Sequence, residues 1–196
     1  MTVFSPRNWV VAVVLLLAAC TNAPPVTKFP QLTYAHLGTF ALDVSEIEIV
    51  DGYQPTLRAP NVEHMMPVAP AAAARQWAQD RLQLAGSSGR RAVFTIDNGA
   101  VISTPLKRKT GISGALTVDQ SERYDAILAV RLEIFDLNGN RLGVAHADAR
   151  RTRSVPENIT LDARDKVWFS ITETLTKDLN AELERAVPQF LGKYLR

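Results

Sequence analysis

Cys20 is the residue whose surroundings point most clearly to chemistry in this chain of 196 residues. It is the only cysteine, so the chain can form neither an internal disulfide nor a cysteine-based zinc site. The residues before it, Leu17-Ala18-Ala19, end in two small side chains that fit the groove of a signal peptidase. A thiol that stands directly after such a cleavage point can be joined to a diacylglycerol through a thioether.

The segment from Met1 to Ala19 has the composition of a leader. It begins with a short stretch in which Arg7 is the only charged side chain, and an apolar run follows from Trp9 to Leu17. This run has the length of a signal-peptide core and is shorter than the ~20 residues of a membrane-spanning helix. We therefore predict that residues 1–19 are a signal peptide. The alternative is an uncleaved anchor helix from Trp9 to Ala19, or a cysteine placed by chance.

At Cys20 the sequence resembles a bacterial lipoprotein, because Leu17 to Cys20 match the lipobox Leu-Ala-(Ala/Gly)-Cys at all four positions. The resemblance implies lipidation of Cys20, removal of residues 1–19 and acylation of the new amino terminus, for example with palmitate. In the best-known sorting rule, which varies between bacteria, Asp after the cysteine retains a lipoprotein in the inner membrane. Thr21 stands there instead, so the resemblance implies a lipid anchor in the outer membrane and a periplasm-facing domain. The weakly basic start of the leader departs from the family's pattern.

Other residues that could do chemistry lack the spacing that it requires. The chain contains no Gly-x-Ser-x-Gly nucleophile motif. Its three histidines, His36, His64 and His146, fall in a tether, a loop and a strand and show no ligand spacing. We therefore expect no catalytic site, no metal and no cofactor, and we predict that the chain is not an enzyme.

One motif has the beginning of a calcium loop. Asp136, Asn138 and Asn140 alternate as the first ligands of such a loop do, but the pattern then requires Gly at its sixth position and Glu at its twelfth. Arg141 and Ala147 occupy these positions. The segment is therefore predicted to be a tight turn.

Basic residues gather in three short clusters, Arg90-Arg91, Lys107-Arg108-Lys109 and Arg150-Arg151-Thr152-Arg153. If they share one side of the domain, they can contact anionic lipid headgroups, at about 1 kcal/mol per basic group near a charged membrane. The candidates for this contact are Lys107, Arg108, Lys109, Arg150, Arg151 and Arg153. The alternative is that these residues keep the domain soluble and pair with its 20 acidic residues. A net charge of +2 argues against a nucleic-acid partner.

The elements in the first half of the chain are predicted from the positions of proline and from the alternation of apolar with polar residues. The Pro-rich residues 20–37 are expected to form an extended tether, after which residues 38–196 form one domain. Residues 40–50 read as a strand with a bulge near Ser45, and residues 51–69 as an ordered loop. A helix is expected from Pro70 to about Ala85, because proline suits the first turn.

The second half carries the strongest patterns. A strand is expected over residues 91–96, which residues 100–103 extend or pair with, and residues 105–122 stay undecided. Alternation predicts a hairpin of residues 124–136 and 141–153, joined at Asn138-Gly139. The small residues Gly143, Ala145, Ala147 and Ala149 share one face of its second strand and leave room for a helix. That helix is expected from about Leu161 to Val187, with Pro188 ending or kinking it. Its apolar i+4 row consists of Val167, Ile171, Leu175, Leu179, Leu183 and Val187.

This order of elements predicts an α+β fold, a two-layer sandwich of a mostly antiparallel sheet packed by two helices, the C-terminal one long. In element order over residues 38–187 it resembles two families, the auxiliary lipoproteins of ABC-type lipid transporters and the lipopolysaccharide-assembly lipoprotein. The resemblance implies a non-enzymatic accessory or binding component of an envelope transport system, with an envelope protein as partner. The alternatives are a cell-envelope hydrolase with an unrecognised site and a purely structural lipoprotein.

Overall fold

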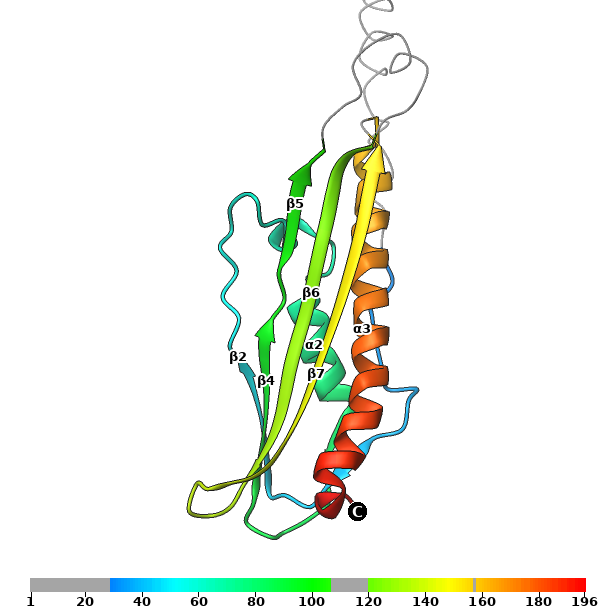
Figure 1. Cartoon of the computed structure of the whole chain (residues 1–196). Helices are drawn as coiled ribbons and strands as arrows, with labels where there is room; N and C mark the ends of the chain where they lie inside the picture. Colours follow the sequence, from blue (N-terminus) through cyan, green and yellow to red (C-terminus); the bar gives the residue numbers. More distant parts are fainter. Residues whose placement is uncertain (1–28, 107–119, 157) are drawn as a thin grey trace, which may run out of the picture.

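The computed structural model describes residues 29–106, 120–156 and 158–196 (Figure 1). A five-stranded sheet forms one layer, and the helices α2 and α3 cover one of its faces (Figure 1). The elements in chain order are β1 (Phe40–Leu42), β2 (Glu46–Asp51), the 3-10 turn η1 (Glu63–Met65), α2 (Pro70–Arg81), β3 (Leu82–Leu84), β4 (Arg91–Asn98), β5 (Val101–Pro105), β6 (Gln120–Phe135), β7 (Arg141–Pro156), α3 (Leu161–Leu191) and the 3-10 turn η3 (Gly192–Tyr194). The predicted two-layer α+β sandwich with a long C-terminal helix is confirmed.

The strand β6 organises the sheet. It pairs with β7 along its whole length, while β4 and β5 pair in succession along its other edge. All three pairings are antiparallel, and β2 adds a parallel edge strand next to β4. Of the two alternatives for residues 100–103, extension of the strand before them is the correct one, since β4 and β5 lie end to end beside β6.

The hairpin turn has the geometry that Asn138-Gly139 predicts. Gly139 has a φ of 82°, a left-handed conformation that glycine adopts without strain. The carboxylate of Asp136 accepts hydrogen bonds from the backbone N–H groups of Asn138 and Asn140, both at 2.8 Å. Asp136 is thus occupied in stabilising the turn, as predicted in place of a calcium loop.

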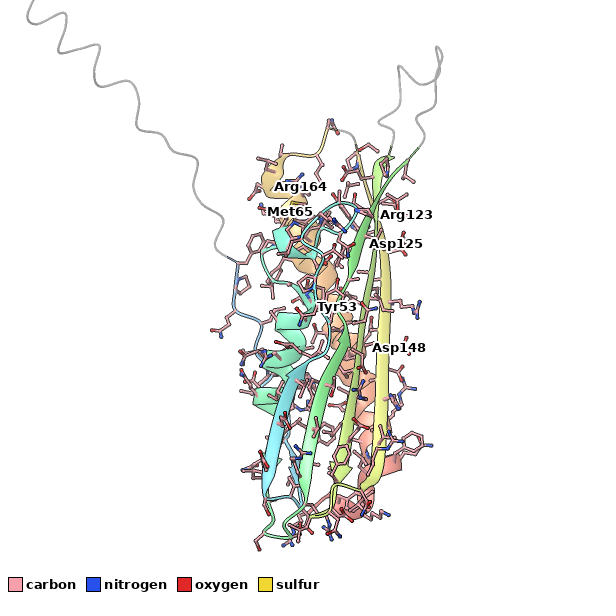
Figure 2. The ribbon with its side chains drawn as sticks, turned by 90° about the vertical axis from the view of Figure 1, so that its left-hand side faces the viewer. Tyr53, Met65, Arg123, Asp125, Asp148 and Arg164 are labelled. Atoms are coloured by element: carbon pink, nitrogen blue, oxygen red, sulfur yellow. The ribbon has the colours of Figure 1, made fainter. Side chains whose placement is uncertain are left out.

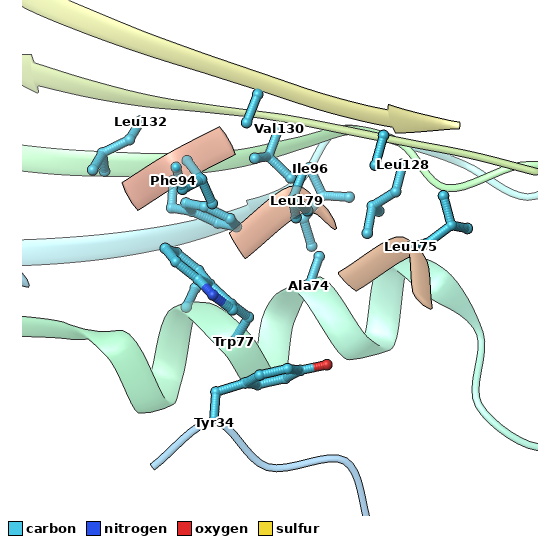
Figure 3. Close-up of a cluster of buried hydrophobic side chains, with 14 of the residues drawn as sticks. Tyr34, Ala74, Trp77, Phe94, Ile96, Leu128, Val130, Leu132, Leu175 and Leu179 are labelled. Atoms are coloured by element: carbon cyan, nitrogen blue, oxygen red, sulfur yellow. The ribbon is translucent and has the colours of Figure 1, made fainter. Parts of the chain in front are cut away.

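The core lies between the sheet and the helices (Figure 3). Leu128 and Leu132 of β6 belong to this core together with Leu175 and Leu179 of α3, and all four are fully buried. Beside them, Ala145, Ala147 and Ala149 of β7 are also buried, as the small-residue face predicts. An added Cβ at Gly143 would lie 2.8 Å from Cδ2 of Leu191, so α3 approaches the start of β7 as closely as glycine allows.

Two predictions in the first half of the chain are wrong. Residues 40–50 form two strands, because β1 leaves the main sheet and pairs in parallel with β3. The predicted bulge near Ser45 is therefore a break between two strands. The helix that begins at Pro70 ends at Arg81, since Leu82–Leu84 must extend to pair with β1.

The long helix begins as predicted and ends later. Thr160 is its N-cap, where the side chain accepts a hydrogen bond from the Ala163 N–H at 3.2 Å. Pro188 does not end the helix, which continues to Leu191. Proline removes one backbone hydrogen bond, but Val187 and Leu191 are fully buried on either side of it, and this apolar burial favours the continued helix.

The segment before β1 packs on the helices. The ring of Phe29 stacks on that of Phe169, with centroids 5.1 Å apart. Tyr34 is buried, and its N–H donates to Asp80 of α2 at 2.6 Å. Residues 29–37 therefore lie against the domain instead of forming part of an extended tether. In the described part of the chain, no helix combines the length and the apolar character that crossing a membrane requires.

Candidate anion-binding groove between β7 and α3

The structure separates the basic residues of β7. Side chains alternate between the two faces of a strand, so Arg150 lies on the opposite face from Arg151 and Arg153. Arg150 stands on the outer face next to Asp148, at 3.6 Å, and Figure 2 shows Asp148 on the side of the sheet away from the helices. Arg151 and Arg153 face α3. The other predicted site residues, Cys20, Lys107, Arg108 and Lys109, lie outside the described residues.

Arg151 and Arg153 line a groove between β7 and α3, with a volume of about 490 Å³. We call it the β7–α3 groove. Its strand wall comes from the exposed end of β7, and its helix wall comes from the N-terminal half of α3. The lining residues are Arg151, Thr152, Arg153, Lys166, Val167, Ser170, Ile171 and Thr174.

Three cations and two neighbouring carboxylates set the charge of this groove. Arg151 forms an ion pair with Asp178 of α3. Lys166 pairs with Asp162 one turn earlier, with 2.6 Å between Nζ and Oδ2. Arg153 forms no ion pair with any residue that the structure describes. The groove therefore carries an excess of positive charge, centred on Arg153.

The helix wall adds residues that the sequence analysis did not single out. Lys166, Ser170 and Thr174 are spaced by four residues, so they form a polar row along α3. This row runs beside Val167 and Ile171, the first two residues of the apolar i+4 row. Val167 is half-buried and lines the groove, so the apolar row is partly exposed at its N-terminal end.

The remaining basic cluster, Arg90-Arg91, is occupied by ion pairs. Arg90 contacts Asp43 at 2.8 Å and Arg91 contacts Glu48 at 3.0 Å. For these two residues the alternative of local ion pairing is correct. The histidines lie on different elements, and the described residues contain no group of three or more His, Cys, Asp or Glu side chains that could hold a metal.

A second pocket, of about 320 Å³, contains the buried carboxylate of Glu63. Burial by itself would raise the pKa of Glu63, but hydrogen bonds outweigh it and hold this pKa below its usual value. The donors include the Tyr53 hydroxyl at 2.7 Å and the Val101 N–H at 3.1 Å. Burial and the neighbouring Glu63 carboxylate in turn raise the pKa of Tyr53. Glu63 is thus an ionised carboxylate that fastens the loop after β2 to the start of β5.

Comparisons with known proteins give no family. No protein-family model matches the chain, and no curated protein is similar in sequence. Among solved structures, rare lipoprotein B from Shewanella oneidensis is 8% identical with a TM-score of 0.40, over 74% of this chain and 96% of that one. A PelC dodecamer from Paraburkholderia phytofirmans is 17% identical with a TM-score of 0.22, over 78% of this chain and 92% of that one. Both TM-scores are too low to assign a function.

Proposed function

We propose that this chain is a non-enzymatic, lipid-anchored protein of the bacterial outer membrane that acts in the periplasm. Its role is that of an accessory or binding component of an envelope system that transports lipid or lipopolysaccharide. The observation that carries the proposal is the lipobox Leu17-Ala18-Ala19-Cys20, placed after a signal-like apolar run and containing the only cysteine of the chain. Two or more acyl chains make such an anchor durable.

The packed N-terminal segment limits how far the domain stands from its proposed anchor. Cys20 lies nine residues before Phe29, which stacks on Phe169 in the N-terminal half of α3. Nine extended residues span at most about 30 Å. The proposed anchor therefore keeps Phe29, which packs on this half of α3, within about 30 Å of the membrane surface.

The test of the anchor is intact-mass analysis of the full chain purified from bacterial membranes, beside a Cys20→Ala variant. The proposal predicts that the wild type lacks residues 1–19 and carries a lipid mass, while the variant stays an unlipidated precursor. Equal unlipidated masses for both proteins would overturn the proposal.

The accessory role is tested separately by crosslinking in intact cells. A component of a transport system should form a defined crosslink with one envelope protein. This crosslink should be lost in the Cys20→Ala variant, which carries no lipid for anchoring in the outer membrane. A lipidated protein that yields no defined crosslink would support the purely structural alternative.

A further inference from the structure

We propose that the β7–α3 groove binds the phosphate of an anionic membrane amphiphile, whose first methylene groups lie on Val167 and Ile171. The inference rests on the proposed lipid anchor for the ligand's source, and on the described residues for its chemistry.

The groove supplies donors from both walls. Arg151 and Arg153 project from β7, and Lys166 with the hydroxyls of Ser170 and Thr174 faces them from α3. A guanidinium group presents a planar fork of N–H donors that matches two oxygens of a phosphate. Arg153 has no ion-pair partner among the described residues, so none of their carboxylates has to be displaced before it binds an anion.

The carboxylates near the groove offset part of its positive charge, so the groove suits a ligand of small negative charge. Asp178 and Asp162 already hold Arg151 and Lys166, so these cations share their donors with an incoming phosphate. Cations so held are fixed near the groove before the ligand arrives, which reduces the entropy lost on binding. A single phosphate fits this arrangement better than a polyanion does.

The apolar residues indicate that the phosphate is part of an amphiphile. Val167 and Ile171 are the apolar residues of the helix wall. A volume of about 490 Å³ falls within the range of small-ligand sites and exceeds what a phosphate alone requires. A lipid headgroup with the start of its acyl chains would contact the charged and the apolar parts together.

The groove is also close to the proposed source of such a ligand. Phe169, on which Phe29 stacks, belongs to the same turns of α3 as Lys166 and Ser170. The point where the chain leaves the domain toward Cys20 is thus at the same end of α3 as the groove. An acidic extended peptide bound along the free edge of β7 is the competing ligand, and the experiment below distinguishes it.

The test is native mass spectrometry of the full lipidated chain released from a neutral detergent, with four probes. These are dihexanoyl phosphatidic acid, dihexanoylglycerol, inorganic phosphate and a hexaglutamate peptide. The inference predicts that the phosphatidic acid binds most tightly. Arg153→Gln should weaken it about tenfold, the effect of losing one charge-assisted hydrogen bond. Ser170→Glu, an exposed change on the helix wall, should weaken it by at least as much.

Arg150→Gln is the matched control for Arg153→Gln, because it removes the same charge three residues away, on the opposite face of β7. The affinity of this control variant for the phosphatidic acid should stay within twofold of the wild type. An equal loss in Arg150→Gln and Arg153→Gln would overturn the inference in favour of diffuse attraction to charged surfaces. Equal binding of inorganic phosphate would overturn the amphiphile, and tighter binding of the peptide would replace it with a protein ligand.

The same spectra separate this inference from the proposed function, since they report the lipid mass on Cys20. A lipidated chain that binds none of the four probes refutes the groove and leaves the anchor standing. An unlipidated chain that binds phosphatidic acid refutes the anchor and leaves the chemistry of the groove intact.

Discussion

The two ends of β7 meet the same helix in opposite ways. At the end near the hairpin turn, Gly143, Ala145 and Ala147 let α3 pack closely, so that no Cβ fits at position 143 without moving Leu191. At the far end, Arg151 and Arg153 stand between strand and helix, and a groove of about 490 Å³ remains. Side-chain size along one strand therefore decides where this sandwich is closed and where it is open to a ligand.

The largest expected effect lies in the closed part. Leu183 is fully buried on the C-terminal half of α3, and Leu183→Ala should leave a cavity that costs about 2–5 kcal/mol of unfolding free energy. Val167→Ala, in the half-buried wall of the groove, should cost less than about 1 kcal/mol, because part of its surface is already in water. Urea unfolding of both variants measures the contrast, and equal losses would contradict it.

Adding a side chain where α3 lies closest to β7 should cost somewhat less unfolding free energy. Gly143→Val places two methyl groups against Leu191 and the ring of Tyr194, and overpacking of this kind costs about 1–3 kcal/mol. The matched change at the open end of the same strand is Ser154→Val, where the side chain is exposed and the expected change is near zero. If both variants unfold at the same urea concentration, α3 does not pack on glycine as described.

The pocket at Glu63 sharpens the contrast, because there the polar groups are already paired with one another. Glu63→Gln should lower the unfolding free energy at pH 7 by about 1–3 kcal/mol, since charge-assisted hydrogen bonds become neutral ones. The pKa of Glu63 is lowered by folding, so its contribution is present above the unfolded pKa and is lost as the pH falls through the folded value. Unfolding measured from pH 7 down to pH 3 should show the variant and the wild type converging, and a constant difference would contradict this role.

The smallest effects concern the stability contribution of the groove itself. Arg151→Gln breaks a partly exposed pair with Asp178 and should cost less than about 1 kcal/mol. Arg153→Gln, which breaks no described ion pair, should leave the unfolding free energy unchanged within about 0.5 kcal/mol. Thermal unfolding checks both values. A larger loss in Arg153→Gln would mean that this residue stabilises the fold and is not available to a ligand.

The sequence predicted the second half of the fold well because its patterns are local. The alternation in β6, the Asn138-Gly139 turn and the i+4 row of α3 each specify an element without reference to distant residues. The break after β1 could not be predicted in this way, since β1 pairs with β3 about 40 residues later. Long-range pairing of this kind overrides the alternation that suggested a single strand.

Part of the groove could be predicted from the sequence. Strand alternation alone separates Arg150 from Arg151 and Arg153, and four-residue spacing aligns Lys166, Ser170 and Thr174. What the sequence lacks is the alignment of these two rows, which depends on how the short connection after β7 turns back into α3. The two rows form one groove only when the helix lies against the edge strand.

The central claim is that the open end of the β7–α3 pair is the end held near the membrane. It is tested most directly by energy transfer from a dye on the lipidated chain to acceptor lipids in vesicles, with the dye on Ser170→Cys or on Asn138→Cys. Lipid on Cys20 leaves the introduced cysteine as the only reactive thiol. Because α3 is about 46 Å long, the account predicts much stronger transfer from position 170 than from the hairpin turn at position 138. Equal transfer from both positions, or stronger transfer from position 138, would contradict it.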